Sequence, residues 1–142
     1  MTEIKHRVEV AAPKERIFQA LSTREGLEWW TPTIEGDASA GGRLAFFFGR
    51  PEASAVMEVA AAAPDRVAWR CVGGPEEWVG TSLTFDLKSS EKGTTLLFTH
   101  AGWREPTEFT AHCSTKWAYH LLGLKAAMEG GSATPYPQGQ TI

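Results

Sequence analysis

The four histidines and two cysteines of this 142-residue chain are the side chains best suited to chemistry. His100 shares the alternation of Leu96 and Phe98 and is therefore expected to face inward, where an imidazole needs a hydrogen-bond partner or a ligand. Structural hydrogen bonding is the favoured interpretation, followed by ligand contact and then by proton transfer. The same parity applies to His6 in an earlier alternating segment.

The pattern of the remaining candidates does not predict a metal centre or a nucleophile. His112, Cys113 and His120 fall on an expected C-terminal helix, but the two histidines are more than two turns apart, whereas helical residues that share a metal normally lie three or four apart. Cys71 and Cys113 lack the helix start and neighbouring base that activate a thiol, which favours core packing. We predict no catalytic residue, no metal and no cofactor.

Two other polar patterns are better explained by turns than by chemistry. Glu76 and Glu77 are adjacent on an expected turn, where neighbouring side chains point apart, so a solvated loop is favoured over an acid/base pair. The glycine pairs at 41–42, 73–74 and 130–131 lack the Lys-Ser/Thr context of a phosphate loop. They are expected to form hairpin turns and a helix stop.

The six tryptophans and seven phenylalanines are the most informative feature of the composition. Many of them share the inner side of expected strands or of the C-terminal helix, so they could fill a core or line a cavity. Trp30 and Trp103 favour a cavity, because both lie at loop or strand-end positions. The residues expected to contact a ligand are Trp30, Phe46, Phe48, Met57, Trp69, Trp78, Phe85, Phe98, His100, Trp103, Trp117 and His120.

Composition narrows the partners of the chain. The net charge is -3, and no basic cluster interleaves with the aromatic residues, so nucleic acid is not expected as a partner. The longest apolar run, 56–64, is interrupted by Glu58 and is far shorter than the roughly 20 residues of a membrane span, so no stable membrane association is expected. Two isolated cysteines favour a reduced, cytoplasmic setting.

Hydrophobic periodicity predicts strands, two short helices and one long helix. A helix with apolar residues at steps of three and four is expected over 107–128, and a short helix over 14–22 is followed by a further turn that ends near Gly26. Trp29 and Trp30 are then expected on a loop. Strands are expected at 3–10, 44–48, 55–62, 66–72, 81–88 and 94–100. Residues 1–130 are expected to form one domain, and 131–142 an irregular tail.

This order of elements predicts an α+β fold in which a curved antiparallel sheet wraps the long C-terminal helix. The helix is the only expected element large enough to cover the apolar face of the sheet. The inward residues would then border a space at one end, with the short helices and the Trp29–Trp30 loop as its rim.

Several segments resemble the SRPBCC superfamily, and most closely its branch of activator of heat-shock-protein-90 ATPase homologue-like proteins. They cover 3 to about 128 and are VEVAAPKERIFQAL at 8–21, LEWW at 27–30, GGRL at 41–44, GTTLLFTHAGW at 93–103, and Trp117 with LLGLK at 121–125. The resemblance implies the helix-grip, START-like fold.

The first functional hypothesis is noncatalytic binding of a small hydrophobic or amphipathic ligand, such as a lipid, in an internal cavity. One alternative is an enzyme of the polyketide cyclase or aromatase type, in which a histidine or carboxylate moves protons. The other, implied by the resemblance alone, is an interaction protein that activates a chaperone ATPase. A homodimer is a further alternative for the assembly.

Overall fold

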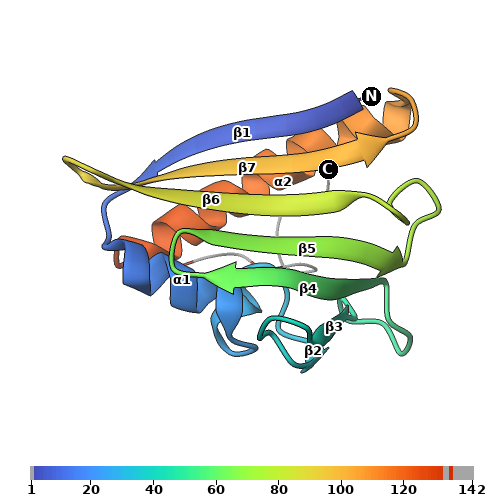
Figure 1. Cartoon of the computed structure of the whole chain (residues 1–142), viewed down its shortest axis with the longest axis horizontal. Helices are drawn as coiled ribbons and strands as arrows, with labels where there is room; N and C mark the ends of the chain where they lie inside the picture. The colour runs from blue at the N-terminus through green and yellow to red at the C-terminus, as the bar shows by residue number, and fades with distance from the viewer. Residues whose placement is uncertain (1, 133–134, 136–142) are drawn as a thin grey trace.

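The computed structural model describes residues 2–132 and 135, and its strands form one antiparallel sheet (Figure 1). Within these residues the sheet has seven strands in the order β1-β7-β6-β5-β4-β3-β2. The first strand therefore pairs with the last, and every other neighbour in the sheet is also a neighbour in the chain. The strands are β1 (Thr2–Val10), β2 (Ile34–Gly36), β3 (Arg43–Phe46), β4 (Ala55–Ala63), β5 (Arg66–Gly73), β6 (Ser82–Ser90) and β7 (Gly93–Trp103).

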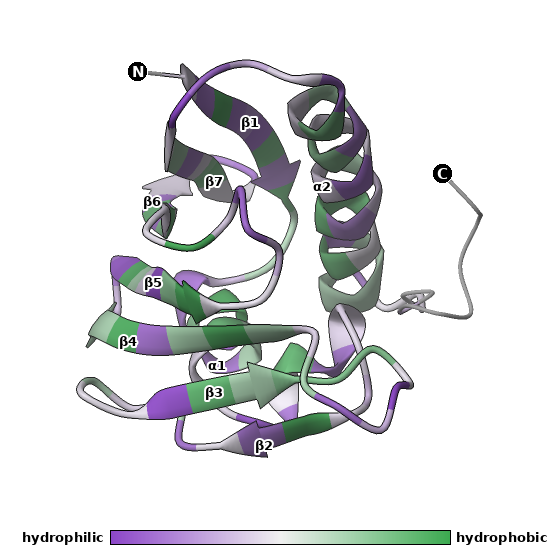
Figure 2. Cartoon of the chain, turned by 90° about the vertical axis from the view of Figure 1, so that its right-hand side faces the viewer, coloured by the Kyte–Doolittle hydropathy of each residue, from purple (hydrophilic) through white to green (hydrophobic). Residues whose placement is uncertain are grey.

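The long helix α2 (Glu108–Met128) lies along one face of the curved sheet (Figure 2). The short helix α1 (Lys14–Ser22) and the 3-10 turn η1 (Gly26–Trp29) follow β1 and close one end of the space between sheet and helix. The predicted helix-grip arrangement is confirmed, with a 3-10 turn as the second of the two short helices.

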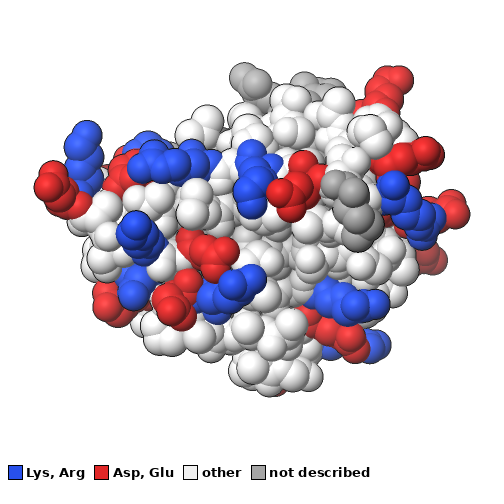
Figure 3. Space-filling model, turned by 45° about the horizontal axis from the view of Figure 1, so that its top comes forward, with Lys and Arg blue, Asp and Glu red and all other residues white. Residues whose placement is uncertain are grey.

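The sheet has one buried and one wet face, as the alternating sequence predicts. In β1, Ile4 and Val8 are buried against the helix side, while Lys5 and Arg7 are exposed on the other side. Basic and acidic side chains are interspersed over the face shown in Figure 3, and neither sign gathers into a patch there. The charged face is in contact with solvent, and the apolar face is the one that α2 covers.

Strand β7 runs three residues beyond its predicted end at His100 because of a bulge. Trp103 pairs with Thr2 while Ala101 pairs with Glu3, which leaves Gly102 as the extra residue. Gly102 has a φ of +92°, a conformation that glycine adopts without a steric penalty. The bulge reverses the parity of the strand, so that Trp103 is buried on the same side as His100.

Helix α2 is held at its start by a reciprocal cap. The Oγ1 of Thr107 accepts a hydrogen bond from the backbone N–H of Thr110 at 3.4 Å, and the Oγ1 of Thr110 accepts one from the backbone N–H of Thr107 at 3.0 Å. The Thr107 hydroxyl in turn donates to the Glu77 carboxylate at 2.6 Å. The turn that contains Glu77 is thereby tied to the helix start.

The other end of α2 is tied to the chain that leaves β1. Lys125 Nζ donates to the backbone carbonyl of Glu9 at 2.7 Å and to the Glu129 carboxylate at 2.6 Å. Glu129 also accepts from the backbone N–H of Ala11 at 2.7 Å. The hydrogen bond from Lys125 is the main reason that the pKa of Glu129 is lowered.

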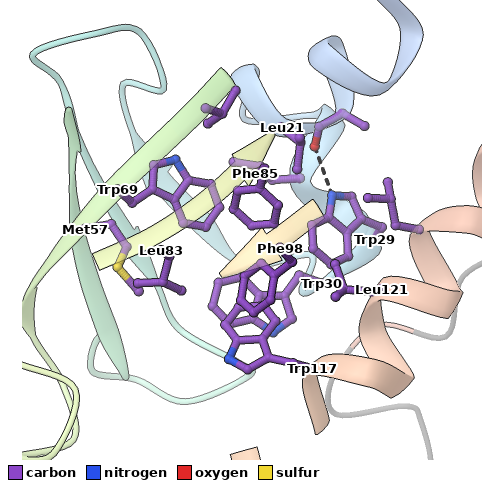
Figure 4. Close-up of a cluster of buried hydrophobic side chains, with 14 of the residues drawn as sticks. Leu21, Trp29, Trp30, Met57, Trp69, Leu83, Phe85, Phe98, Trp117 and Leu121 are labelled. Atoms are coloured by element: carbon purple, nitrogen blue, oxygen red, sulfur yellow. Dashed lines mark hydrogen bonds between the residues drawn. The ribbon is translucent and has the colours of Figure 1, made fainter. Parts of the chain in front are cut away.

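Aromatic rings fill the interior of the fold between α1, the sheet and the middle of α2 (Figure 4). The ring centroid of Trp117 lies 4.5 Å from that of Phe98 and 4.9 Å from that of Trp30. Trp29 and Trp30 were expected on a loop at the rim, but each is only 4% exposed. The 3-10 turn directs both rings inward, where Trp29 Nε1 donates to the carbonyl of Ala20 at 2.9 Å.

Two further differences from the predicted elements occur around β3. Strand β2 was not predicted, because three residues are too few to show alternation. Phe48 was predicted on the strand face of Leu44 and Phe46, but β3 ends at Phe46 and Phe48 lies in a turn with a φ of +52°. Residues 133–134 and 136–142 of the predicted tail lie outside the described residues, so the boundary at residue 130 stays a prediction.

Gly93 is predicted to be irreplaceable at the turn between β6 and β7. Its φ is +141°, and an added Cβ would lie 2.5 Å from the carbonyl oxygen of Val10 and 2.7 Å from the backbone nitrogen of Ala12. We expect Gly93→Ala to lower the free energy of unfolding by about 3 kcal/mol through backbone strain and overpacking, as measured by urea denaturation.

Gly80→Ala is the matched control, because Gly80 also has a positive φ, +91°, but an added Cβ would meet nothing within 4 Å. It is expected to cost only about 1 kcal/mol. Equal losses for the two variants would contradict the close packing of Gly93 against the end of β1.

Candidate functional site

A cavity of ≈ 660 Å³ opens beside the N-terminal half of α2. Its other walls are the connection between β3 and β4 and the turn before β6. This volume is within the range of pockets that enclose small-molecule ligands. The lining residues are Trp30, Phe48, Arg50, Pro51, Glu52, Ala53, Ser54, Ala55, Pro75, Trp78, Phe109, His112, Cys113, Lys116, Trp117 and His120.

The local backbone of each wall follows from its sequence. On α2, Phe109, Cys113 and Trp117 recur at steps of four and so present one apolar stripe to the cavity. In the connection between β3 and β4, a turn brings the backbone N–H of Arg50 to the carbonyl of Phe47 at 3.0 Å. Both walls are therefore fixed by hydrogen-bonded backbone.

Three tryptophans form the inner wall of the cavity. The rings of Trp78 and Trp117 are stacked, with an interplanar angle of 16° and centroids 6.0 Å apart. The rings of Trp30 and Trp78 are also stacked, with an interplanar angle of 24° and centroids 6.5 Å apart. The buried Nε1 of Trp78 has no well-formed hydrogen bond; its weak partner is the sulfur of Cys113. The wall is consequently aromatic, with the indole N–H of Trp117 donating to His100 and that of Trp78 without a strong acceptor.

Burial controls the protonation of the titratable groups on this wall. It lowers the pKa of His120 to about 4, and the nearby ammonium group of Lys116 acts in the same direction. Burial raises the pKa of the Cys113 thiol to about 11, although Trp78 and Lys116 partly oppose this shift. At neutral pH the imidazole of His120 and the thiol of Cys113 are both uncharged.

His100 lies beneath this wall in a complete hydrogen-bond chain. Trp117 Nε1 donates to Nδ1 of His100 at 3.2 Å, so the proton of the neutral ring is on Nε2, which donates to Thr81 Oγ1 at 2.8 Å. The Thr81 hydroxyl donates onward to the carbonyl of Trp78 at 2.6 Å. Burial lowers the pKa of His100 to about 3. Both ring nitrogens are thus committed to structural bonds.

The structure divides the residues expected to contact a ligand into two groups. Some line the cavity, namely Trp30, Phe48, Trp78, Trp117 and His120. The others do not line it and are at most 1% exposed, namely Phe46, Met57, Trp69, Phe85, Phe98, His100 and Trp103. The sequence assigned both groups to one interior, from strand parity, helix spacing or loop position, but only the first group lines the cavity.

The charged residues of the cavity wall were not predicted from the sequence. Lys116 was not singled out, although it completes a series with His112 and His120 at steps of four along α2. That spacing was the available signal, since it places all three side chains on one helix face. Arg50 and Glu52 could not have been found, because nothing in the sequence indicates which way their connection folds.

The structure gives two further findings on metals and membranes. Among residues 2–132 and 135, no group of three or more His, Cys, Asp or Glu side chains is arranged to hold a metal ion. None of the helices in the same described part of the chain is long and apolar enough to cross a membrane.

A curved sheet that grips a long C-terminal helix, with an apolar pocket beside that helix, defines the class of helix-grip proteins. The chain belongs to the family described as Activator of Hsp90 ATPase homolog 1-like protein, whose family model matches residues 11–129.

Among solved structures, the Aha1 dimer of Colwellia psychrerythraea is similar over 92% of this chain and 98% of that chain, with 42% identity and a TM-score of 0.83. CalU16 from Micromonospora echinospora is similar over 96% of this chain and 68% of its own, with 19% identity and a TM-score of 0.71. DynU16, from the dynemicin biosynthetic locus, is similar over 92% and 48%, with 21% identity and a TM-score of 0.74. No curated protein matches the chain.

The buried neutral state of His100 predicts a specific loss of stability in acid. The folded protein keeps His100 unprotonated down to about pH 3, whereas the unfolded chain takes up a proton below its ordinary pKa of 6.5. Between about pH 6.5 and about pH 3, the unfolded state therefore binds more protons than the folded state. The free energy of unfolding consequently decreases as the pH is lowered, by up to about 1.4 kcal/mol per pH unit.

His100→Asn keeps an acceptor for the Trp117 N–H but does not titrate. When the pH is lowered from about 6.5 to about 4.5, both proteins lose stability, and we expect the loss in the variant to be smaller than the loss in the parent protein by about 2 kcal/mol. The measurement is urea denaturation at each pH. Parallel pH profiles would show that His100 is not held neutral by the fold.

Proposed function

We propose that the protein binds a small hydrophobic or amphipathic ligand in the cavity beside α2, without catalysing a reaction on it. The observation that carries this proposal is an open cavity of ≈ 660 Å³ whose inner wall is made of Trp30, Trp78 and Trp117. A ligand in the cavity would remove the exposed apolar surface of the lining from water, which is worth roughly 25 cal/mol per Å². Because the three tryptophans are at most 8% exposed, the partly buried rings of Phe48 and Phe109 contribute to that surface as well. The family membership of the chain supports the fold on which the cavity depends.

The aromatic wall is held in place before any ligand arrives. Trp117 is fixed by its hydrogen bond to His100 and by its contact with Phe98. Trp30 packs on Phe46 with their centroids 4.8 Å apart, which leaves it little room to move. Binding to a preorganised wall loses little conformational entropy, so more of the apolar burial contributes to affinity.

The chemistry around the cavity favours binding over catalysis. The nitrogens of His100, the residue to which the enzyme alternative assigns proton transfer, are already bonded to Trp117 and Thr81. The pKa of Cys113, about 11, keeps the thiol in its weakly nucleophilic form at neutral pH. The likeness to DynU16 and CalU16 is below 25% identity and is a likeness of fold. We therefore place the cyclase-type enzyme behind the binding protein.

Phe109 provides a test of the proposed cavity because it lines the mouth and is only partly buried. With N-phenyl-1-naphthylamine as a neutral fluorescent probe, we expect saturable binding and a loss of about tenfold in affinity for Phe109→Ala, which corresponds to about 1.4 kcal/mol of lost apolar contact. The measurement is fluorescence titration.

Leu122→Ala is the control, since Leu122 is on the same helix, 57% exposed and outside the cavity lining. Its affinity for the probe should equal that of the parent protein. Absence of saturable binding, or equal losses in the two variants, would contradict the proposed site.

Activation of a chaperone ATPase is the second candidate function. It is favoured by the family description and by the 42% identity to an Aha1 protein. That relative is described as a dimer, which also makes a homodimer a proposal for this chain.

The test is the ATP hydrolysis rate of the Hsp90 of the same host, with and without the protein. If the second candidate function holds, the steady-state rate should rise severalfold and saturate with added protein. A rate that is unchanged at saturating protein would exclude the activator function and leave ligand binding untouched.

A further inference from the structure

The wall of α2 that faces the cavity carries a second stripe beside its apolar one. His112, Lys116 and His120 all line the cavity and lie at steps of four, so they follow the helix for about 12 Å. The apolar stripe of Phe109, Cys113 and Trp117 is displaced from this basic stripe by one to three residues, as expected for adjacent helix faces. The cavity therefore has an apolar wall with nitrogen-bearing side chains along its edge.

The charges around the cavity are not symmetrically placed. Among the described residues of the lining, the cations are Lys116 on the half-buried helix wall and Arg50 on the connection between β3 and β4, while the carboxylate of Glu52 is exposed on that same connection. Glu77 lies outside the lining, and its carboxylate accepts a hydrogen bond from Thr107 Oγ1 at 2.6 Å. Among the described lining residues, the helix wall thus contributes an ammonium group and two imidazoles, and the carboxylate lies on the connection across from it.

The field of Lys116 reaches the interior of the cavity wall. Its ammonium group lowers the pKa of both Cys113 and His120. At Cys113 it acts more strongly than the opposing carboxylate of Glu77. A negative group placed over this part of α2 would be attracted, and the attraction would be strengthened by the low dielectric of the aromatic wall.

We propose that the ligand of this cavity is an amphipath with one anionic head group, whose apolar body covers Trp30, Trp78 and Trp117 and whose head group is held by Lys116 with His120 beside it. This inference rests on the ligand-binding function proposed above and adds the charge class of the ligand. An ammonium–carboxylate hydrogen bond supplies the specificity, and the aromatic contact supplies most of the affinity. The neutral imidazole of His120 can donate a second hydrogen bond to the same head group.

The test compares three ligands of equal chain length as competitors of N-phenyl-1-naphthylamine. Dodecanoate, dodecanol and dodecyltrimethylammonium share their apolar body and differ in head-group charge. We expect dodecanoate to displace the probe with an affinity at least about tenfold higher than dodecanol, and the cationic ligand to be the weakest. Equal affinities, or a preference for the cation, would overturn the anionic class while leaving the binding function intact. Failure of the probe to bind would overturn both.

Two variants test whether the preference for dodecanoate depends on the helix wall. Lys116→Gln should lower the affinity for dodecanoate about tenfold while changing that for dodecanol by less than about twofold, so the alcohol reports that the cavity is still folded. Lys88→Gln, on the exposed end of β6, is the matched control and should change neither. An unchanged affinity of Lys116→Gln for dodecanoate would contradict the proposed head-group site.

Discussion

The hydrogen bond from Trp117 to His100 is the interaction on which the cavity depends. It joins the middle of α2 to β7 through two side chains that are both buried, and it continues through Thr81 to the carbonyl of Trp78. A buried imidazole destabilises the fold unless both of its nitrogens are hydrogen-bonded. This series of hydrogen bonds therefore stabilises one position of the helix over the sheet. Trp78 and Trp117 are held at its two ends, and these are the rings that wall the cavity.

The interior between sheet and helix is solid over part of its length and open over the rest. Toward α1, successive rings pack on one another with centroid separations of 5.0 to 5.6 Å, in the order Phe46, Trp69, Phe85 and Phe98. Toward the start of α2, the connection between β3 and β4 stands away from the helix and leaves the cavity between them. Inward-facing strand residues therefore form the core at one end, whereas residues of α2 and of two connections line the cavity at the other. This division gives one fold both a rigid core and a binding surface.

Much of the architecture followed from the sequence because its signals are local. The alternation in β1 and the three-and-four spacing of α2 each reflect one buried face, and the tested elements lie close to their predicted bounds. Trp103 shows where local signals fail: the bulge at Gly102 is a property of the pairing with β1, which no single strand reveals. Phe48 shows a second limit, since its turn depends on where the next strand begins. The cavity was expected at one end, but its polar edge at Lys116 depends on how α2 and a connection some sixty residues earlier come together.

The central claim is that three of the six tryptophans wall an open cavity while the others are packed away from it. Titration of the uniformly ¹⁵N-labelled protein with N-phenyl-1-naphthylamine, followed through the indole N–H signals in NMR spectra, tests it most directly. The account predicts that the signals of Trp30, Trp78 and Trp117 shift with the ligand and that those of Trp69 and Trp103 stay in place. Shifts confined to Trp69 and Trp103, or shifts of similar size at all six indoles, would contradict it.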